Sequence, residues 1–181
     1  MGSPDSILLA RMQSLLTFVL SCLLLAFSGS AKADIYSEVN RLVMAEQWSS
    51  AQSQAEKHLK TQPTDPQMRL LLSRIQDGQG QAAAAIATLQ ILSQSFPELP
   101  EPHNNLAALL ARQNRYAEAL VSLQAAIRAR PDYATALENL GDVYLALAIE
   151  AYQNANRAMP SQPRTTNKRL AVEQILSSST P

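Results

Sequence analysis

The 181-residue chain carries 15 Lys and Arg against 15 Asp and Glu, so its formal net charge is zero with histidine neutral. The charges are not grouped in blocks, which argues against nucleic acid or an anionic membrane surface as a partner. A single cysteine, Cys22, excludes an intrachain disulfide framework.

An apolar segment lies near the N-terminus. Residues 15–27 carry no charge, Arg11 precedes them, and Ala31-Lys32-Ala33 follows. A positive start, a short apolar core and an A-x-A site are typical of a secretory signal peptide. The run is shorter than the ~20 residues that a membrane-spanning helix needs. We therefore expect residues 1–33 to be a signal peptide and the protein to be exported, to a bacterial periplasm.

Other interpretations of this segment stay open. An uncleaved signal would anchor the protein in a membrane, and Cys22 would be lipidated if residues 19–22 formed a lipoprotein box. Leu20 argues against the box, because a small residue normally stands there. Translation can begin at Met1 or at Met12.

Cleavage would leave residues 34–181, with no cysteine and with 13 Lys and Arg against 14 Asp and Glu. A chain of this size normally forms one domain with a usable core.

Prolines and alanines recur in this part of the chain at a constant interval of about 34 residues, which is the period of a two-helix solenoid unit. Apolar residues between them follow the 3.6-residue period of helices, and two such patterns separated by a turn fill each interval. Asn114, in one of these turns, tolerates the left-handed conformation that helix ends favour. Proline suits the turn that follows a helix, and alanine lets two helices cross closely. The recurring residues are Pro63, Pro97 and Pro131, and Ala51, Ala85 and Ala119.

The arrangement resembles the tetratricopeptide repeat. The first copy departs from the family pattern at His58, where a small or apolar residue is usual. The residues that carry the resemblance are Leu106-Ala107, Leu110, Tyr116, Ala119, Leu123, Ala126 and Pro131 in one copy, Leu72-Ser73, Gly80, Ala85, Leu89, Leu92 and Pro97 in the copy before it, and Val39, Leu42, Trp48, Ala51, Leu59 and Pro63 in the first.

The resemblance implies an all-α, right-handed α-solenoid of helical hairpins over residues 34–160. The hairpins are expected at about residues 34–65, 66–99 and 100–133, with a degenerate copy at 134–160.

The degenerate copy predicts one long helix instead of two. Leu140-Gly141 and Tyr144 match the family pattern, but Pro160 follows Pro131 sooner than the repeat period requires, and no turn residue interrupts the helical phase. We therefore expect a fused helix over about residues 135–158. The alternative is a tight kink near Ala148.

A last helix is expected after the break at Pro160-Ser161-Gln162-Pro163. Thr165 or Thr166 can cap it, and the apolar residues continue to about Leu176. Because terminal repeats need a cover, we predict that residues 161–177 form a capping helix packed on the fused helix. Residues 178–181 are expected to be a disordered tail.

No constellation for catalysis or metal binding stands out. His58 and His103 have no ligand partner three or four residues away, and Asp77-Gly78-Gln79-Gly80 follows no strand, as a phosphate-binding loop would. We expect no enzymatic activity, no cofactor, no metal and no small-molecule substrate.

The resemblance implies a concave groove that binds peptides, lined by the first helix of each hairpin. It places Arg74, Asn104, Asn105, Arg112, Glu138, Asn139 and Asp142 on or near this surface. We expect peptide binding by Arg74, Asn105, Arg112, Asn139 and Asp142, with the two arginines selecting charge.

Asn105 and Asn139 are separated by one repeat period, so their amides could form a ladder along the backbone of an extended peptide. The alternative is two ordinary solvated asparagines. Some members of the family bind the acidic C-terminus of a partner with a set of lysines and asparagines, the carboxylate clamp. This site is not predicted here. Asn40 matches one residue of the clamp, but its other positions hold Tyr36, Leu71 and Glu101.

The predicted function is a non-catalytic protein-interaction scaffold that binds a peptide or a segment of an envelope protein. The alternative is a structural subunit of an envelope complex that self-associates, as a homodimer, through residues 135–158. The apolar stripe of the fused helix motivates this alternative, because one short helix would not cover it.

Overall fold

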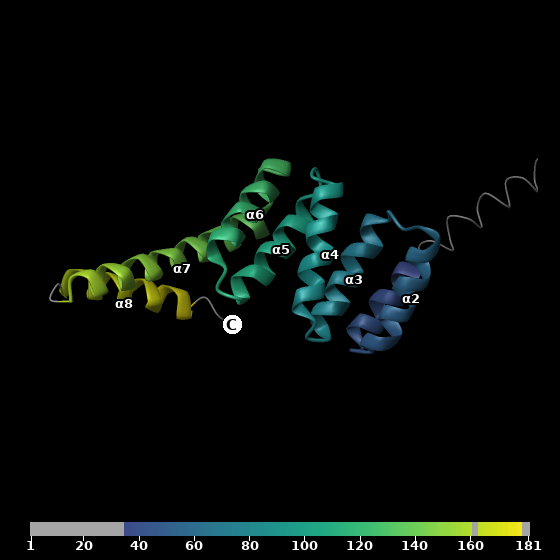
Figure 1. The fold of residues 1–181 in the computed structure, drawn as a ribbon, viewed down its shortest axis with the longest axis horizontal. Helices are drawn as coiled ribbons and strands as arrows, with labels where there is room; N and C mark the ends of the chain where they lie inside the picture. Colours follow the sequence, from purple (N-terminus) through teal and green to yellow (C-terminus); the bar gives the residue numbers. More distant parts are fainter. Residues whose placement is uncertain (1–34, 161–162, 179–181) are drawn as a thin grey trace, which may run out of the picture.

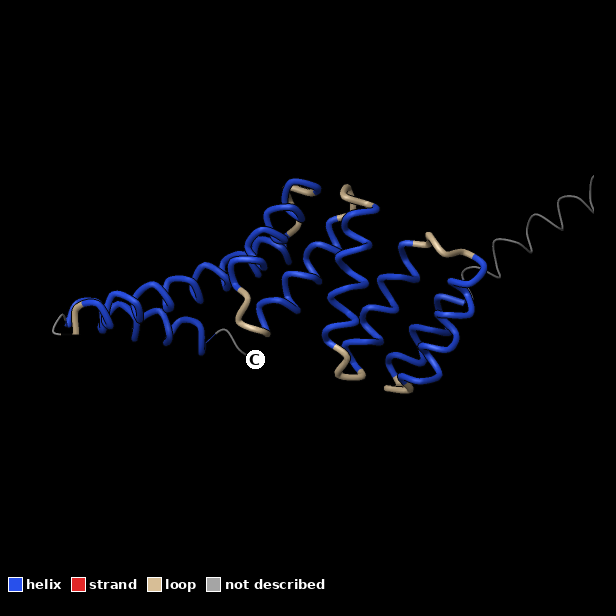
Figure 2. Tube along the Cα trace, in the orientation of Figure 1, coloured by secondary structure: helices blue, strands red, loops and turns tan. Residues whose placement is uncertain are grey.

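The computed structural model describes residues 35–160 and 163–178, and these residues form helices joined by short turns. The predicted signal peptide and nearly all of the predicted tail lie outside the described residues. Within the described part, no residue is in a strand (Figure 2). None of the described helices is both long enough and apolar enough to cross a membrane.

The helices stack side by side in chain order (Figure 1). Residues 35–44 form a first helix, which pairs with α2. This arrangement confirms the predicted all-α solenoid of helical hairpins. The later helices are α2 (Trp48–Thr61), α3 (Pro66–Gly78), α4 (Ala82–Ser95), α5 (Pro100–Arg112), α6 (Tyr116–Ala129), α7 (Ala134–Ala158) and α8 (Pro163–Ser178).

A left-handed residue turns the chain inside each of the first three hairpins. Glu46, Gly80 and Asn114 have φ values of 56°, 74° and 58°, and one repeat period separates each from the next. After each of them, a backbone N–H donates to the carbonyl five residues earlier, as in the Schellman motif. These bonds are Gln47 to Leu42 (2.9 Å), Gln81 to Gln76 (2.8 Å) and Arg115 to Leu110 (3.0 Å).

The fourth such position holds Ala148, and there the chain does not turn. Alanine has the highest helix propensity, and the left-handed conformation costs ~1–2 kcal/mol for a residue with a Cβ. The helix α7 therefore continues through Ala148 for 25 residues, about 37 Å at 1.5 Å per residue. The predicted fused helix is confirmed, with its first residue one position earlier than expected.

The three repeated alanines lie in the interior of the solenoid. Ala51, Ala85 and Ala119 are fully buried, as expected where a larger side chain would push two helices apart. The buried residues gather in two clusters, one around the first hairpin and α3 and one from α4 to the start of α7.

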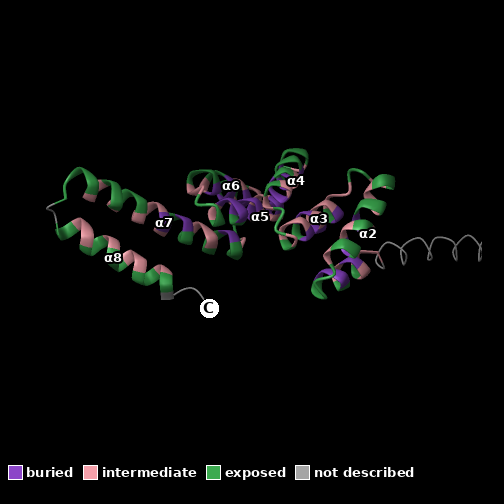
Figure 3. Ribbon diagram, turned by 60° about the horizontal axis from the view of Figure 1, so that its bottom comes forward, coloured by how far each residue is buried: buried purple, intermediate pink, exposed green. Residues whose placement is uncertain are grey.

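The far half of α7 lies outside this core. The buried residues of α7 are Ala136, Val143 and Ala146, and none of residues 147–158 is buried. There, α8 packs against α7 and runs back in the opposite direction (Figures 1 and 3). The predicted contact between capping helix and fused helix is thus present, and the two form an arm at the end of the solenoid.

Replacing Glu46 by glycine is expected to stabilise the protein. Glu46 is exposed and bears the steric cost of a positive φ, which glycine avoids. After allowing for the extra chain entropy of glycine, we expect a gain of about 1 kcal/mol, or about 2–4 °C in melting temperature. Thermal unfolding followed by circular dichroism measures it. Glu46→Ala removes the same side chain but keeps the strain, and an equal rise in that control would contradict the explanation.

Candidate functional site: a divided concave groove

Two neighbouring cavities lie along the helices that the sequence predicted to line the groove. The first, of about 310 Å³, lies among residues of α3, α4 and α5. The second, of about 260 Å³, lies among residues of α5, α6, α7 and α8. Ala108 borders both, so they are two parts of one surface. The first cavity contains Arg74, Asn105 and Arg112 of the predicted site, and the second contains Asn139 and Asp142.

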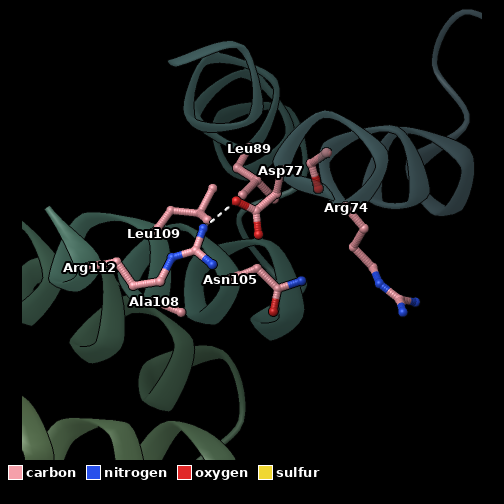
Figure 4. Close-up of a pocket in the computed structure, with 8 residues that line it drawn as sticks. Arg74, Asp77, Leu89, Asn105, Ala108, Leu109 and Arg112 are labelled. Carbon is pink, nitrogen blue, oxygen red and sulfur yellow. Dashed lines mark hydrogen bonds and ion pairs between the residues drawn. The ribbon is translucent and has the colours of Figure 1, made fainter. Parts of the chain in front are cut away.

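The two arginines of the first cavity differ in their surroundings (Figure 4). Arg112 of α5 forms an ion pair with Asp77 of α3, which links two successive hairpins. Both side chains are partly exposed, so the pair contributes about 1 kcal/mol at most, but it neutralises the charge of Arg112. The guanidinium of Arg74 points away from this pair and has no acidic partner among the described residues. Arg74 is therefore the available cation of this cavity.

Part of the lining of the first cavity is apolar. Leu89, Ala108 and Leu109 are its apolar lining residues, of which Leu89 and Leu109 belong to the buried core and Ala108 is exposed. Ser73 also borders it, but its hydroxyl donates to the carbonyl of Leu70 at 2.7 Å. The proton of this hydroxyl is therefore engaged with the backbone of its own helix.

An asparagine that was not among the predicted binding residues connects α5 to α7. Asn104 is only 5% exposed. Its Oδ1 accepts a hydrogen bond from Nδ2 of Asn139 at 2.9 Å, and its Nδ2 donates to Oδ1 of Asn105 at 3.5 Å. The two predicted ladder amides are therefore joined through Asn104, and Asn139 already uses one of its donors inside the protein.

The second cavity carries the opposite charge. Asp142 is exposed and has no basic partner among the described residues. The rest of the lining is mostly apolar and includes Val143, Ala146 and, from α8, Leu176. The groove thus presents an available cation in one cavity and an available carboxylate in the next.

The positions compared with the carboxylate clamp do not assemble an anion site. Nδ2 of Asn40 donates to the backbone carbonyl of Tyr36 at 3.0 Å, and Leu71 is buried. Glu101 accepts a hydrogen bond from Arg130 at 2.9 Å. Each of these groups serves the internal structure of the solenoid.

A buried polar cluster explains the departure of the first repeat at His58. Nε2 of His58 lies 2.7 Å from Oδ2 of Asp65, and both side chains are 8% exposed. The hydroxyl of Tyr36 donates to the same oxygen, while Oδ1 accepts from the backbone N–H of Met68 and so caps α3. The cluster joins the first hairpin to the second. The sequence pattern does not indicate it, because its members come from three helix ends.

The cluster also shifts two pKa values. Burial, together with the hydrogen bond to the Asp65 carboxylate, raises the pKa of the Tyr36 phenol to about 12. Burial pushes the pKa of Asp65 upward, but the hydrogen bonds from Tyr36, Met68 and His58 outweigh it and lower the pKa. Asp65 therefore stays ionised as the acceptor that holds the junction.

Within the part of the chain that the structure describes, no three His, Cys, Asp or Glu residues are grouped as metal ligands would be.

Comparison with known proteins agrees with the repeat architecture. The family model described as TPR repeat matches residues 109–147. No curated protein matches the sequence.

Several solved structures are similar. A crystal structure of MamA protein is 23% identical, with a TM-score of 0.57 over 77% of this chain and 80% of that one. A second MamA crystal structure is 21% identical, with a TM-score of 0.56 over 77% and 90%. A structure of Naa15/Naa10 bound to HypK-THB is 18% identical, with a TM-score of 0.54 over 82% of this chain but only 25% of the matched one. At these identities, the likeness shows the fold alone.

Removing the Asn139 amide is expected to destabilise the protein. Asn139→Ala leaves the buried Oδ1 of Asn104 without its donor, which costs about 1–3 kcal/mol. Asn105→Ala removes only a long, weak contact and should cost less than half as much. Urea unfolding of both variants measures the difference. Equal losses, or no loss in Asn139→Ala, would show that the amide chain does not support the junction of α5 and α7.

Proposed function

The chain is a tetratricopeptide-repeat protein, and from this premise we propose that its concave groove binds an extended segment of another protein without transforming it chemically. The observation that carries the proposal is the first cavity, whose lining combines apolar residues with an available cation and an amide. Sites that bind ligands are typically concave and apolar, with a few polar groups that fix orientation.

The two polar groups of the first cavity suit different parts of a peptide. Asn105 uses its Oδ1 within the protein, and its Nδ2 is available to a backbone carbonyl of the ligand. Arg74 suits a carboxylate side chain, because guanidinium and carboxylate form charge-assisted pairs. Ala108, an exposed apolar residue of the same lining, can contact an apolar side chain of the ligand.

The charges of the groove favour one direction of the bound segment. Arg74 borders the first cavity and Asp142 the second, with opposite charges. A segment with an acidic residue at one end and a basic residue at the other can pair with both of these charges in only one of its two orientations. Complementary charges of this kind contribute more to specificity than to affinity.

The partner is proposed to be a protein of the cell envelope. The signal-peptide pattern of residues 1–33 supports the compartment. The similarity of the fold to a Naa15/Naa10 complex that is bound to HypK-THB supports a protein as the partner. The proposed role is that of a scaffold, which holds a partner segment in place.

Self-association through α7 is the second candidate. Leu137 and Tyr144 of α7 are about half exposed, and no residue of its far half is buried. Sedimentation of residues 34–181 decides between the two, because a monomer at micromolar concentration would reject the self-associating subunit.

Charge reversal at Arg74 is expected to weaken the binding of peptides that use the groove. Dodecapeptides would be selected from a displayed random library against residues 34–181, and their affinities measured by fluorescence polarisation. Loss of a charge-assisted pair corresponds to about a tenfold or larger rise in Kd for Arg74→Glu. Arg128→Glu is the matched control, since Arg128 borders neither cavity. If the peptides bind the unsubstituted protein and both variants equally, the groove is not the binding site.

Export is expected to remove residues 1–33. Expression of the full chain in a bacterium, followed by mass spectrometry of the periplasmic fraction, should give a protein that begins at Asp34. Ala33→Pro should block cleavage while it leaves the apolar core intact. Recovery of the uncleaved chain from the cytoplasm would reject the signal peptide, and recovery of a lipid-modified Cys22 would replace it with a lipoprotein signal.

A further inference from the structure

We propose that the C-terminal turn of α8 occupies part of the concave groove and must be displaced by any ligand that extends into the second cavity. The proposal rests on the proposed function for its biological meaning, but not for its structural test. Leu176 is the α8 residue that lines this cavity, together with Asn139 and Asp142 of α7 and Tyr116 of α6.

The length of the arm brings Leu176 back to the groove. From Ala146, which also lines the second cavity, α7 continues outward to its last residue, Ala158. From its first residue, Pro163, α8 returns to Leu176. At about 1.5 Å per residue these two segments are about 18 Å and about 20 Å long. The outward and return paths therefore match in length, and α8 runs back along α7 toward the solenoid (Figure 1), which agrees with Leu176 and Ala146 lining the same cavity.

The helix α8 is held weakly compared with the helices of the core. None of residues 163–177 is buried, whereas α5 has seven buried residues. Leu170 and Ile175 are 51% and 53% exposed. Elements with few buried apolar contacts open at low free energy, well below the free energy of global unfolding.

Two polar contacts between α8 and α7 lie toward the outer end of the arm. Oγ1 of Thr165 donates to Oδ1 of Asn156, and the ammonium of Lys168 lies 5.8 Å from the ring centroid of Tyr152. Contacts of this kind at exposed sites contribute only about 1 kcal/mol each. They hold the start of α8, so its C-terminal end can leave the groove while the start stays attached.

The groove therefore has an open section and a covered one. A short segment fills the first cavity and leaves α8 in place. A longer segment that reaches Asp142 binds only the fraction of molecules in which the end of α8 has moved away, and its affinity is lowered by that fraction. The arm thus acts as an internal competitor and selects ligands by length.

The test compares two substitutions in α8 by ¹⁵N NMR, on residues 34–181 and without any ligand. Leu176→Asp places a carboxylate in an apolar contact beside Asp142, so it should expel the end of α8. We expect shifted amide resonances on the groove side, in residues 107–111 and 139–146. We also expect at least tenfold faster hydrogen exchange in the last two turns of α8. Leu170→Asp is the control, because Leu170 is half exposed and does not line the cavity.

Circular dichroism verifies that both variants remain folded. Groove shifts in Leu176→Asp that are absent from Leu170→Asp support the proposal. Absence of groove shifts in Leu176→Asp, or identical shifts in both variants, would overturn it. Failure of peptides to bind any variant would instead count against the proposed function, so the two ideas fail separately.

Discussion

The left-handed turn that recurs once in each repeat is the constraint on which the rest of the structure depends. At Glu46, Gly80 and Asn114 it reverses the chain after a helix of limited length, so that each second helix packs back on the first. The repeated alanines are buried because these reversals are in register. At Ala148 the backbone stays helical, and the same spacing that builds the solenoid then produces the arm.

Period and residue type were enough to predict most of the fold. The hairpins follow from apolar periodicity, and the fused helix follows from the missing turn residue before Pro160, since both are local properties of the backbone. Side-chain partners across helices were less predictable. The pairing of Arg112 with Asp77 depends on how far two helices from different hairpins approach each other, which no spacing in the sequence reports.

In the candidate site, too, the position of the backbone was easier to predict than the partners of the side chains. Its location was predictable, because the first helices of successive hairpins supply all five predicted residues. Whether each of these side chains is available to a ligand or is already bonded within the protein was not predictable. The amide of Asn139 was expected to face a ligand, yet it is bonded to Asn104, a neighbour of the residue chosen for the ladder. A buried amide and an exposed one look alike in a sequence when both lie near the boundary of a helix face.

The straight α7 also changes what the C-terminal side of the solenoid can stack upon. A solenoid grows by stacking each new hairpin on the open face of the last one, and any complete terminal hairpin offers a template for one more. Here the last unit is stretched into a rod, and α8 folds along that rod instead of returning over the core. Within the described residues, the regular stacking of hairpins is consequently interrupted at α7, and the absence of one turn in a short stretch of sequence is enough to interrupt it.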